Sequence, residues 1–177
     1  MPSDLYERIV GERGSLESLI AKIPGFKGYQ EGVARREADA VLRRYLSDRF
    51  EDLVKRFVRL ENRMLDSGGL QHMARSREVK SKLQAYLDRV RTASPKYSAM
   101  FASVKVGPDD LEQIYAFDEA QIRYVTSFSE ALDQLEDAIK KNEDLREAMD
   151  AVYDIAVEAI EAFSLRDDVI TRVSETL

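Results

Sequence analysis

Residues 42–64 read LRRYLSDRFEDLVKRFVRLENRM, and their spacing decides the fold class. Apolar side chains recur every three or four residues, at Leu42, Leu46, Phe50, Leu53, Phe57, Leu60 and Met64. This is the period of one face of an α-helix, whereas a half-buried strand would alternate at every second residue. The stretch therefore predicts one unusually long amphipathic helix, at about residues 30–66.

The same period runs through most of the chain and predicts an all-α fold, a helical bundle of four long helices plus short helices. Further helical stretches are expected at about residues 4–23, 70–92, 108–141 and 142–163. Pro24, Ser67-Gly68-Gly69 and Gly107-Pro108 provide the breaks between them. Ser94-Pro95 predicts the start of another short helix.

Two weaker signals concern the helix ends. Asn142 is a plausible N-cap for the helix that follows it. Ser164-Leu165-Arg166-Asp167 resembles a capping sequence, which predicts a break and a last short helix after it. Gly11 and Gly14 are expected to kink the first helical stretch.

The length of the helix at 30–66 bears on assembly. At ~1.5 Å per residue it would be about 54 Å long. A compact chain of 177 residues has a diameter of roughly 40 Å. The helix must therefore kink near Arg35–Asp39, belong to an elongated bundle, or pack against a second copy of the chain.

The composition excludes several classes of protein. Apolar residues make up 44 % of the chain, which is enough for a packed core. There is no Cys, so a disulfide framework and a Cys-ligated zinc site are excluded. No run approaches the roughly 20 apolar residues of a membrane span, and residues 1–23 lack the apolar segment of a signal peptide. We expect a single helical domain over residues 1–177, located in the cytoplasm, with no cofactor and no metal.

Charge is divided unevenly along the chain. Residues 1–105 hold 21 Lys and Arg against 14 Asp and Glu, whereas residues 106–177 hold 6 against 19. The basic half and the acidic half meet in the irregular stretch 92–108, which is a candidate hinge. Such asymmetry favours interaction, either between the two halves or with charged partners.

One candidate site lies where the core stripe of the 30–66 helix turns polar. Projected towards the helix start, the apolar face carries charged residues, and a glycine-containing loop with Lys27 precedes it. On the helix at 108–141, the Asp118 carboxylate falls inside the apolar arc and needs a basic partner. The simplest partner is Arg35, Arg36 or Arg43. Together they form a candidate anion or partner-binding site whose role is either structural or functional: Lys27, Arg35, Arg36, Asp39, Arg43 and Asp118.

The second candidate is an acidic helical face at three- and four-residue spacing. It is either a solvated surface or a docking face for basic helices, in the same chain or in another subunit. Its members are Glu147, Asp150, Asp154, Glu158 and Glu161.

His72 is the only histidine, so it cannot supply the paired Glu-x-x-His motifs of a di-iron bundle. It is expected to lie exposed near a helix start. The basic residues of the 70–92 helix suggest nucleic acid, but the acidic chain and the charge pairs within the 30–66 helix make such binding weak and non-specific.

The sequence favours a non-enzymatic helical interaction or scaffold protein that self-associates, as a dimer, through charged and apolar faces. Tyr45, Val58 and Leu65 are the expected apolar contacts. The alternatives are a nucleic-acid or anionic-surface binding module built on the basic half, and an enzyme with an Arg/Asp anion site. No sequence pattern decides among these three.

Overall fold

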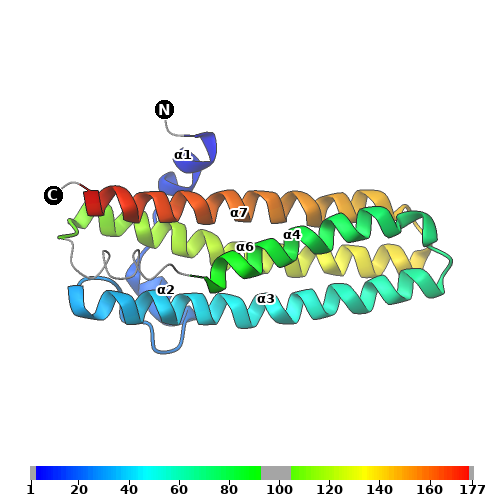
Figure 1. The fold of residues 1–177 in the computed structure, drawn as a ribbon, viewed down its shortest axis with the longest axis horizontal. Helices are drawn as coiled ribbons and strands as arrows, with labels where there is room; N and C mark the ends of the chain where they lie inside the picture. Colours follow the sequence, from blue (N-terminus) through cyan, green and yellow to red (C-terminus); the bar gives the residue numbers. More distant parts are fainter. Residues whose placement is uncertain (1–2, 93–104, 176–177) are drawn as a thin grey trace.

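The computed structural model describes residues 3–92 and 105–175 and confirms an all-α helical bundle (Figure 1). Four helices form it: α3 (Arg35–Asp66), α4 (Met73–Arg91), α6 (Pro108–Lys141) and α7 (Leu145–Glu175). Helix α3 packs beside α4 and α6, and α7 packs beside the same two helices. The pairs α3–α4 and α6–α7 are antiparallel hairpins, so α4 and α7 both begin at one end of the bundle.

The bundle is elongated, which is one of the three alternatives expected for the long helix, and two other helices have a similar length. Helix α3 has 32 residues and runs beside α6 with 34 and α7 with 31. Residues 30–34 do not belong to it, because a 3-10 turn, η1 (Gly32–Ala34), precedes Arg35. Its length therefore matches that of its neighbours and does not require a second copy of the chain.

The turns use the expected glycine and proline residues. Gly68 takes a left-handed conformation at φ 82° between α3 and the 3-10 turn η2 (Leu70–His72), and Pro108 opens α6. Asn142 lies at φ 57° and ends α6, so the prediction that it caps the next helix is wrong. The Asp144 carboxylate instead accepts from the backbone N–H of Arg146, 2.9 Å away, in the first turn of α7.

Helix α7 also corrects the predicted break at residues 164–167, because it continues through them to Glu175. The Ser164 hydroxyl donates to the carbonyl of Ile160 one turn back, 3.0 Å away, and caps nothing. The start of a short helix predicted at Ser94-Pro95 and most of the candidate hinge 92–108 lie outside the described residues.

The N-terminal segment lies against the outside of the bundle (Figure 1). Its first helical stretch is divided into α1 (Asp4–Gly11) and α2 (Leu16–Lys22), and the Ser15 hydroxyl caps α2 by accepting from the amide of Ser18. Helix α1 packs on α6 and α7, and α2 packs on α6. The loop after α2 then buries Tyr29, whose carbonyl accepts from Arg35 at the start of α3.

Candidate functional site

A buried ion network joins three bundle helices, with Arg166 of α7 at its centre. The Arg166 Nε donates to Asp118 Oδ1 of α6 at 2.6 Å, and its Nη2 donates to Asp39 Oδ1 of α3 at 2.7 Å. Arg43 Nε donates to Asp39 Oδ2 at 2.9 Å, and the Tyr29 hydroxyl donates to Asp118 Oδ2 at 2.5 Å. All four carboxylate oxygens therefore accept a hydrogen bond. We call Tyr29, Asp39, Arg43, Asp118 and Arg166 the Arg166 network.

Local backbone geometry brings Tyr29 into this network. Gly28 adopts φ 85°, and a Cβ there would lie 2.7 Å from the Tyr115 hydroxyl, so glycine permits the close approach. The Tyr115 hydroxyl in turn accepts from the backbone N–H of Tyr29 at 3.1 Å. The Arg35 Nε donates to the Tyr29 carbonyl at 2.7 Å. The loop is thus held from both α3 and α6.

The two buried carboxylates of the network differ in pKa. Burial raises the pKa of Asp118, and Arg166 offsets only part of that effect. Burial would also raise the pKa of Asp39, but the guanidinium groups of Arg166 and Arg43 hold it below its ordinary value. Burial and the Asp118 carboxylate raise the pKa of Tyr29 well above its usual range, so its phenol stays protonated and donates.

The structure brings together only part of the first predicted site. Asp39, Arg43 and Asp118 meet in the network, and Arg35 is buried beside it. Lys27 and Arg36 are exposed. The expectation that Asp118 pairs with Arg35, Arg36 or Arg43 is wrong, because its ion pair is with Arg166.

Arg166 is the residue that the sequence reasoning missed. The sequence pattern at residues 164–167 predicts a cap there, but Arg166 continues the core stripe of α7, three residues after Phe163 and three before Val169. Helical periodicity carried through residues 164–167 would have placed an arginine in the core, opposite the unpaired Asp118.

The acidic face of α7 is partly covered by basic side chains of the same chain. Arg75 Nε of α4 donates to Asp150 Oδ1 at 2.7 Å, and Arg8 of α1 pairs with Glu158. The Tyr124 hydroxyl also donates to Glu158, at 2.8 Å. The other three predicted members of the face form no ion pair within the described residues and are exposed: Glu147, Asp154 and Glu161.

The two halves of opposite charge pair with each other inside one chain. Arg56 of α3 contacts Asp133 and Glu136 of α6 at 2.6 and 3.0 Å, and Arg63 contacts Glu136 at 2.8 Å. Within the basic half, Lys80 of α4 also pairs with Glu61 of α3, at 2.9 Å. Basic residues of the first half therefore pair with acidic residues of the second half across neighbouring helices.

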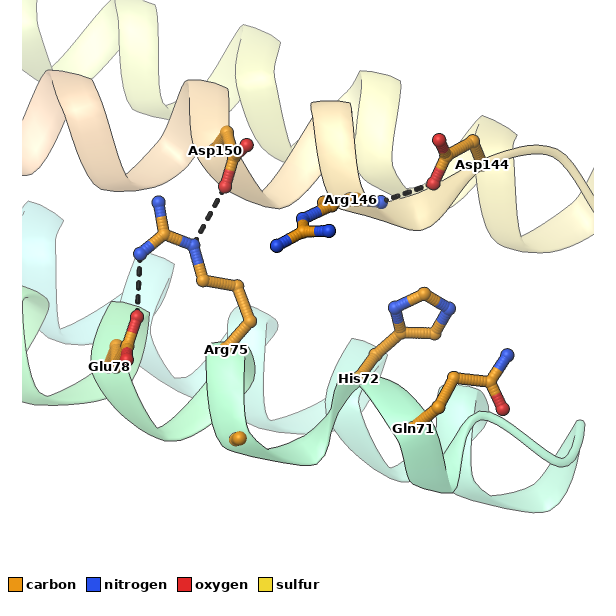
Figure 2. A pocket seen from close by; sticks show the side chains of 8 residues that line it. Gln71, His72, Arg75, Glu78, Asp144, Arg146 and Asp150 are labelled. Atoms are coloured by element: carbon orange, nitrogen blue, oxygen red, sulfur yellow. Dashed lines mark hydrogen bonds and ion pairs between the residues drawn. The ribbon is translucent and has the colours of Figure 1, made fainter.

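A second polar site lies at the opposite end of the bundle, between the starts of α4 and α7. Figure 2 shows this cleft, which has a volume of about 760 Å³. His72 lines it at the η2–α4 junction and is half-buried, not exposed as predicted. Arg75 and Arg146 reach into it from the two helices. We call it the His72 cleft.

Residues 3–92 and 105–175 contain neither a metal-site cluster nor a membrane-spanning helix. Three or more His, Asp or Glu residues do not gather there as a metal site would require, and none of the helices is long and apolar enough to cross a membrane. No family model, curated protein or solved structure matches this chain.

Proposed function

We propose that this protein is a non-enzymatic helical interaction protein that self-associates as a dimer through the outer face of α3. The main support is the exposure of two apolar side chains on one side of this helix, Val58 at 36 % and Leu65 at 37 %. Leu70, in the turn beyond, is 74 % exposed. Large apolar side chains at helical spacing on a surface favour a partner helix.

The spacing of this face suits a second copy of the chain. Lys55, Val58, Asn62 and Leu65 follow one another at intervals of three and four residues, as in the seam of a coiled coil. An antiparallel two-fold axis near Asn62 would set Val58 of one copy against Leu65 of the other. The same axis would set Lys55 opposite Gly68 of the second copy, so the contact is mainly apolar. We call these four residues the α3 seam.

The Arg166 network favours a structural role over a catalytic one. Its carboxylates and guanidinium groups are engaged with one another, and Arg166 and Asp118 are fully buried. An enzyme needs a group that can reach a substrate. The charge pairing between the two halves explains the asymmetry without a partner, so the proposed dimer rests on the α3 seam and not on charge.

Tyr45 does not belong to this face. At about 100° per residue it lies roughly 220° around α3 from Val58. It is half-buried against the core, with the Arg49 guanidinium 5.3 Å above its ring. The proposed apolar contacts are therefore Val58 and Leu65, without Tyr45.

Sedimentation velocity over a range of micromolar concentrations tests the proposal. We expect a reversible dimer that Val58→Glu combined with Leu65→Glu converts to a monomer, because each copy would place charges in the seam. Val157→Glu is the matched control, since Val157 is 41 % exposed but lies on α7. A monomeric parent protein at all concentrations would refute self-association.

A further inference from the structure

The His72 cleft contains side chains of two kinds, engaged and unengaged. Arg75 is engaged: its Nη1 donates to Glu78 at 2.6 Å, its Nε donates to Asp150 at 2.7 Å, and its guanidinium lies 4.1 Å from the centre of the Tyr153 ring. The Asp144 carboxylate accepts from the backbone of Arg146. The three carboxylates that line the cleft therefore already have donors.

The unengaged groups are all able to donate. Within the described part of the chain, no hydrogen bond or ion pair reaches the guanidinium of Arg146, the imidazole of His72 or the amide of Gln71. Figure 2 shows the Arg146 guanidinium in the space between the two helices, on the Arg75 side of the His72 ring, whereas the Gln71 amide points away from it. A guanidinium offers five N–H donors in a planar fork that matches an oxyanion.

Gln71 and His72 separate the His72 cleft from a second cavity. The same two residues line a second, smaller cavity of about 150 Å³, which lies between the α3–α4 turn and the α6–α7 turn near Gly69 and Asn142. A ligand held by Arg146 and His72 would have room around it, because Arg146 is exposed and His72 is half-buried.

We propose that the His72 cleft binds a small phosphate-type oxyanion between Arg146 of α7 and His72 of α4. A phosphate oxyanion has enough acceptor oxygens to engage donors that converge from two helices. The carboxylates of Glu78, Asp144 and Asp150 also line the cleft and limit the affinity by repulsion, so we expect weak binding, on the order of millimolar. The proposal does not rest on self-association.

Isothermal titration of the full chain with inorganic phosphate tests this, at constant ionic strength set with chloride. We expect saturable binding at one site per chain. Arg146→Gln should weaken it at least about tenfold, because a charge-assisted pair of hydrogen bonds is lost. His72→Gln should weaken it by a smaller factor. Arg77→Gln is the matched control, since Arg77 is an exposed arginine of α4 that does not line the cleft.

Heteronuclear NMR locates the same event. Phosphate should shift the backbone signals of residues 70–75 and 144–150 and leave those around Asp118 in place. Absence of saturation at tens of millimolar phosphate would overturn the proposal. Equal weakening by Arg77→Gln and Arg146→Gln would overturn it too, because binding would then be a general effect of surface charge.

Discussion

Arg166 and Asp118 form an ion pair from which solvent is excluded: the Nε and Oδ1 atoms are 2.6 Å apart, and both side chains are 0 % exposed. Removing two charges from water costs several kcal/mol for each ion, and their attraction offsets this only with good geometry and further hydrogen bonds. Tyr29 and Asp39 supply those bonds. The pair therefore ties the register of α6 and α7 to the loop and to α3.

Replacing the arginine tests this arrangement. Arg166→Met should lower the free energy of unfolding by about 3–5 kcal/mol, because two carboxylates lose their buried cation. Arg59→Met is the control, since Arg59 is exposed on α3, and its effect should stay within about 0.5 kcal/mol. Urea denaturation followed by circular dichroism measures both. Equal, small losses would contradict the burial of Arg166.

The hydroxyl of Tyr29 has a separable role. It donates to Asp118 and accepts from Arg166 Nη2 at 3.0 Å, so Tyr29→Phe leaves both charged groups short of a partner. We expect a loss of about 1–3 kcal/mol in the free energy of unfolding. Tyr153→Phe, in which a half-buried ring loses its hydroxyl, should change stability little. If the two variants unfold at the same urea concentration, Tyr29 does not complete the network.

The loop between α1 and α2 makes a close approach to α6. A Cβ added at Gly14 would lie 2.3 Å from the backbone nitrogen of Ala116, whereas one added at Gly11 would meet nothing within 4 Å. Backbone atoms of a long helix cannot yield, so Gly14→Ala should displace the N-terminal segment. Amide hydrogen exchange over residues 5–31 should accelerate in Gly14→Ala and stay as in the parent in Gly11→Ala. Unchanged exchange in both would show that the contact is loose.

Glu136 links stability to pH. It accepts from Arg56, Arg63 and Lys140, and these three bases lower its pKa from 4.5 to about 2. The unfolded chain therefore takes up the proton first as the pH falls. The stability that this carboxylate contributes is complete above pH 4.5 and is lost as the pH approaches about 2.

Glu136→Gln should consequently be less stable than the parent near neutral pH and equal to it near pH 2, and added salt should shrink the difference. Asp137→Asn serves as the control, because Asp137 is exposed and forms no ion pair within the described residues. Urea titrations at stepped pH make the comparison. A difference that stays constant from pH 7 to pH 2 would show that the ion pairs do not act through protonation.

The sequence predicted the bundle because its helices have regular apolar faces. The face from Leu42 to Met64 repeats at helical spacing, and glycine and proline residues mark the turns at Gly68 and Pro108. These signals are local. They need no knowledge of which helix packs against which.

The candidate site was only partly predictable, because it depends on contacts between helices that are distant in the sequence. The burial of Asp118 followed from its place among apolar residues, but its partner is 48 residues away on α7. The residue spacing within α6 does not indicate which residue of another helix contacts Asp118. A capping pattern at residues 164–167 also competed with continuation of the helix, and the packing of Phe163, Val169 and Ile170 in the core outweighs it.

Dimer formation through the α3 seam can be tested most directly by cross-linking, because the chain contains no Cys. A single Asn62→Cys places one thiol at the proposed two-fold axis, where the two Cα atoms would approach the roughly 5.5 Å of a disulfide. Glu130→Cys on the exposed side of α6 is the control. We predict that mild oxidation converts Asn62→Cys to a covalent dimer faster than Glu130→Cys, with Val58→Glu abolishing the difference. Equal, slow cross-linking of both variants would contradict a dimer built on α3.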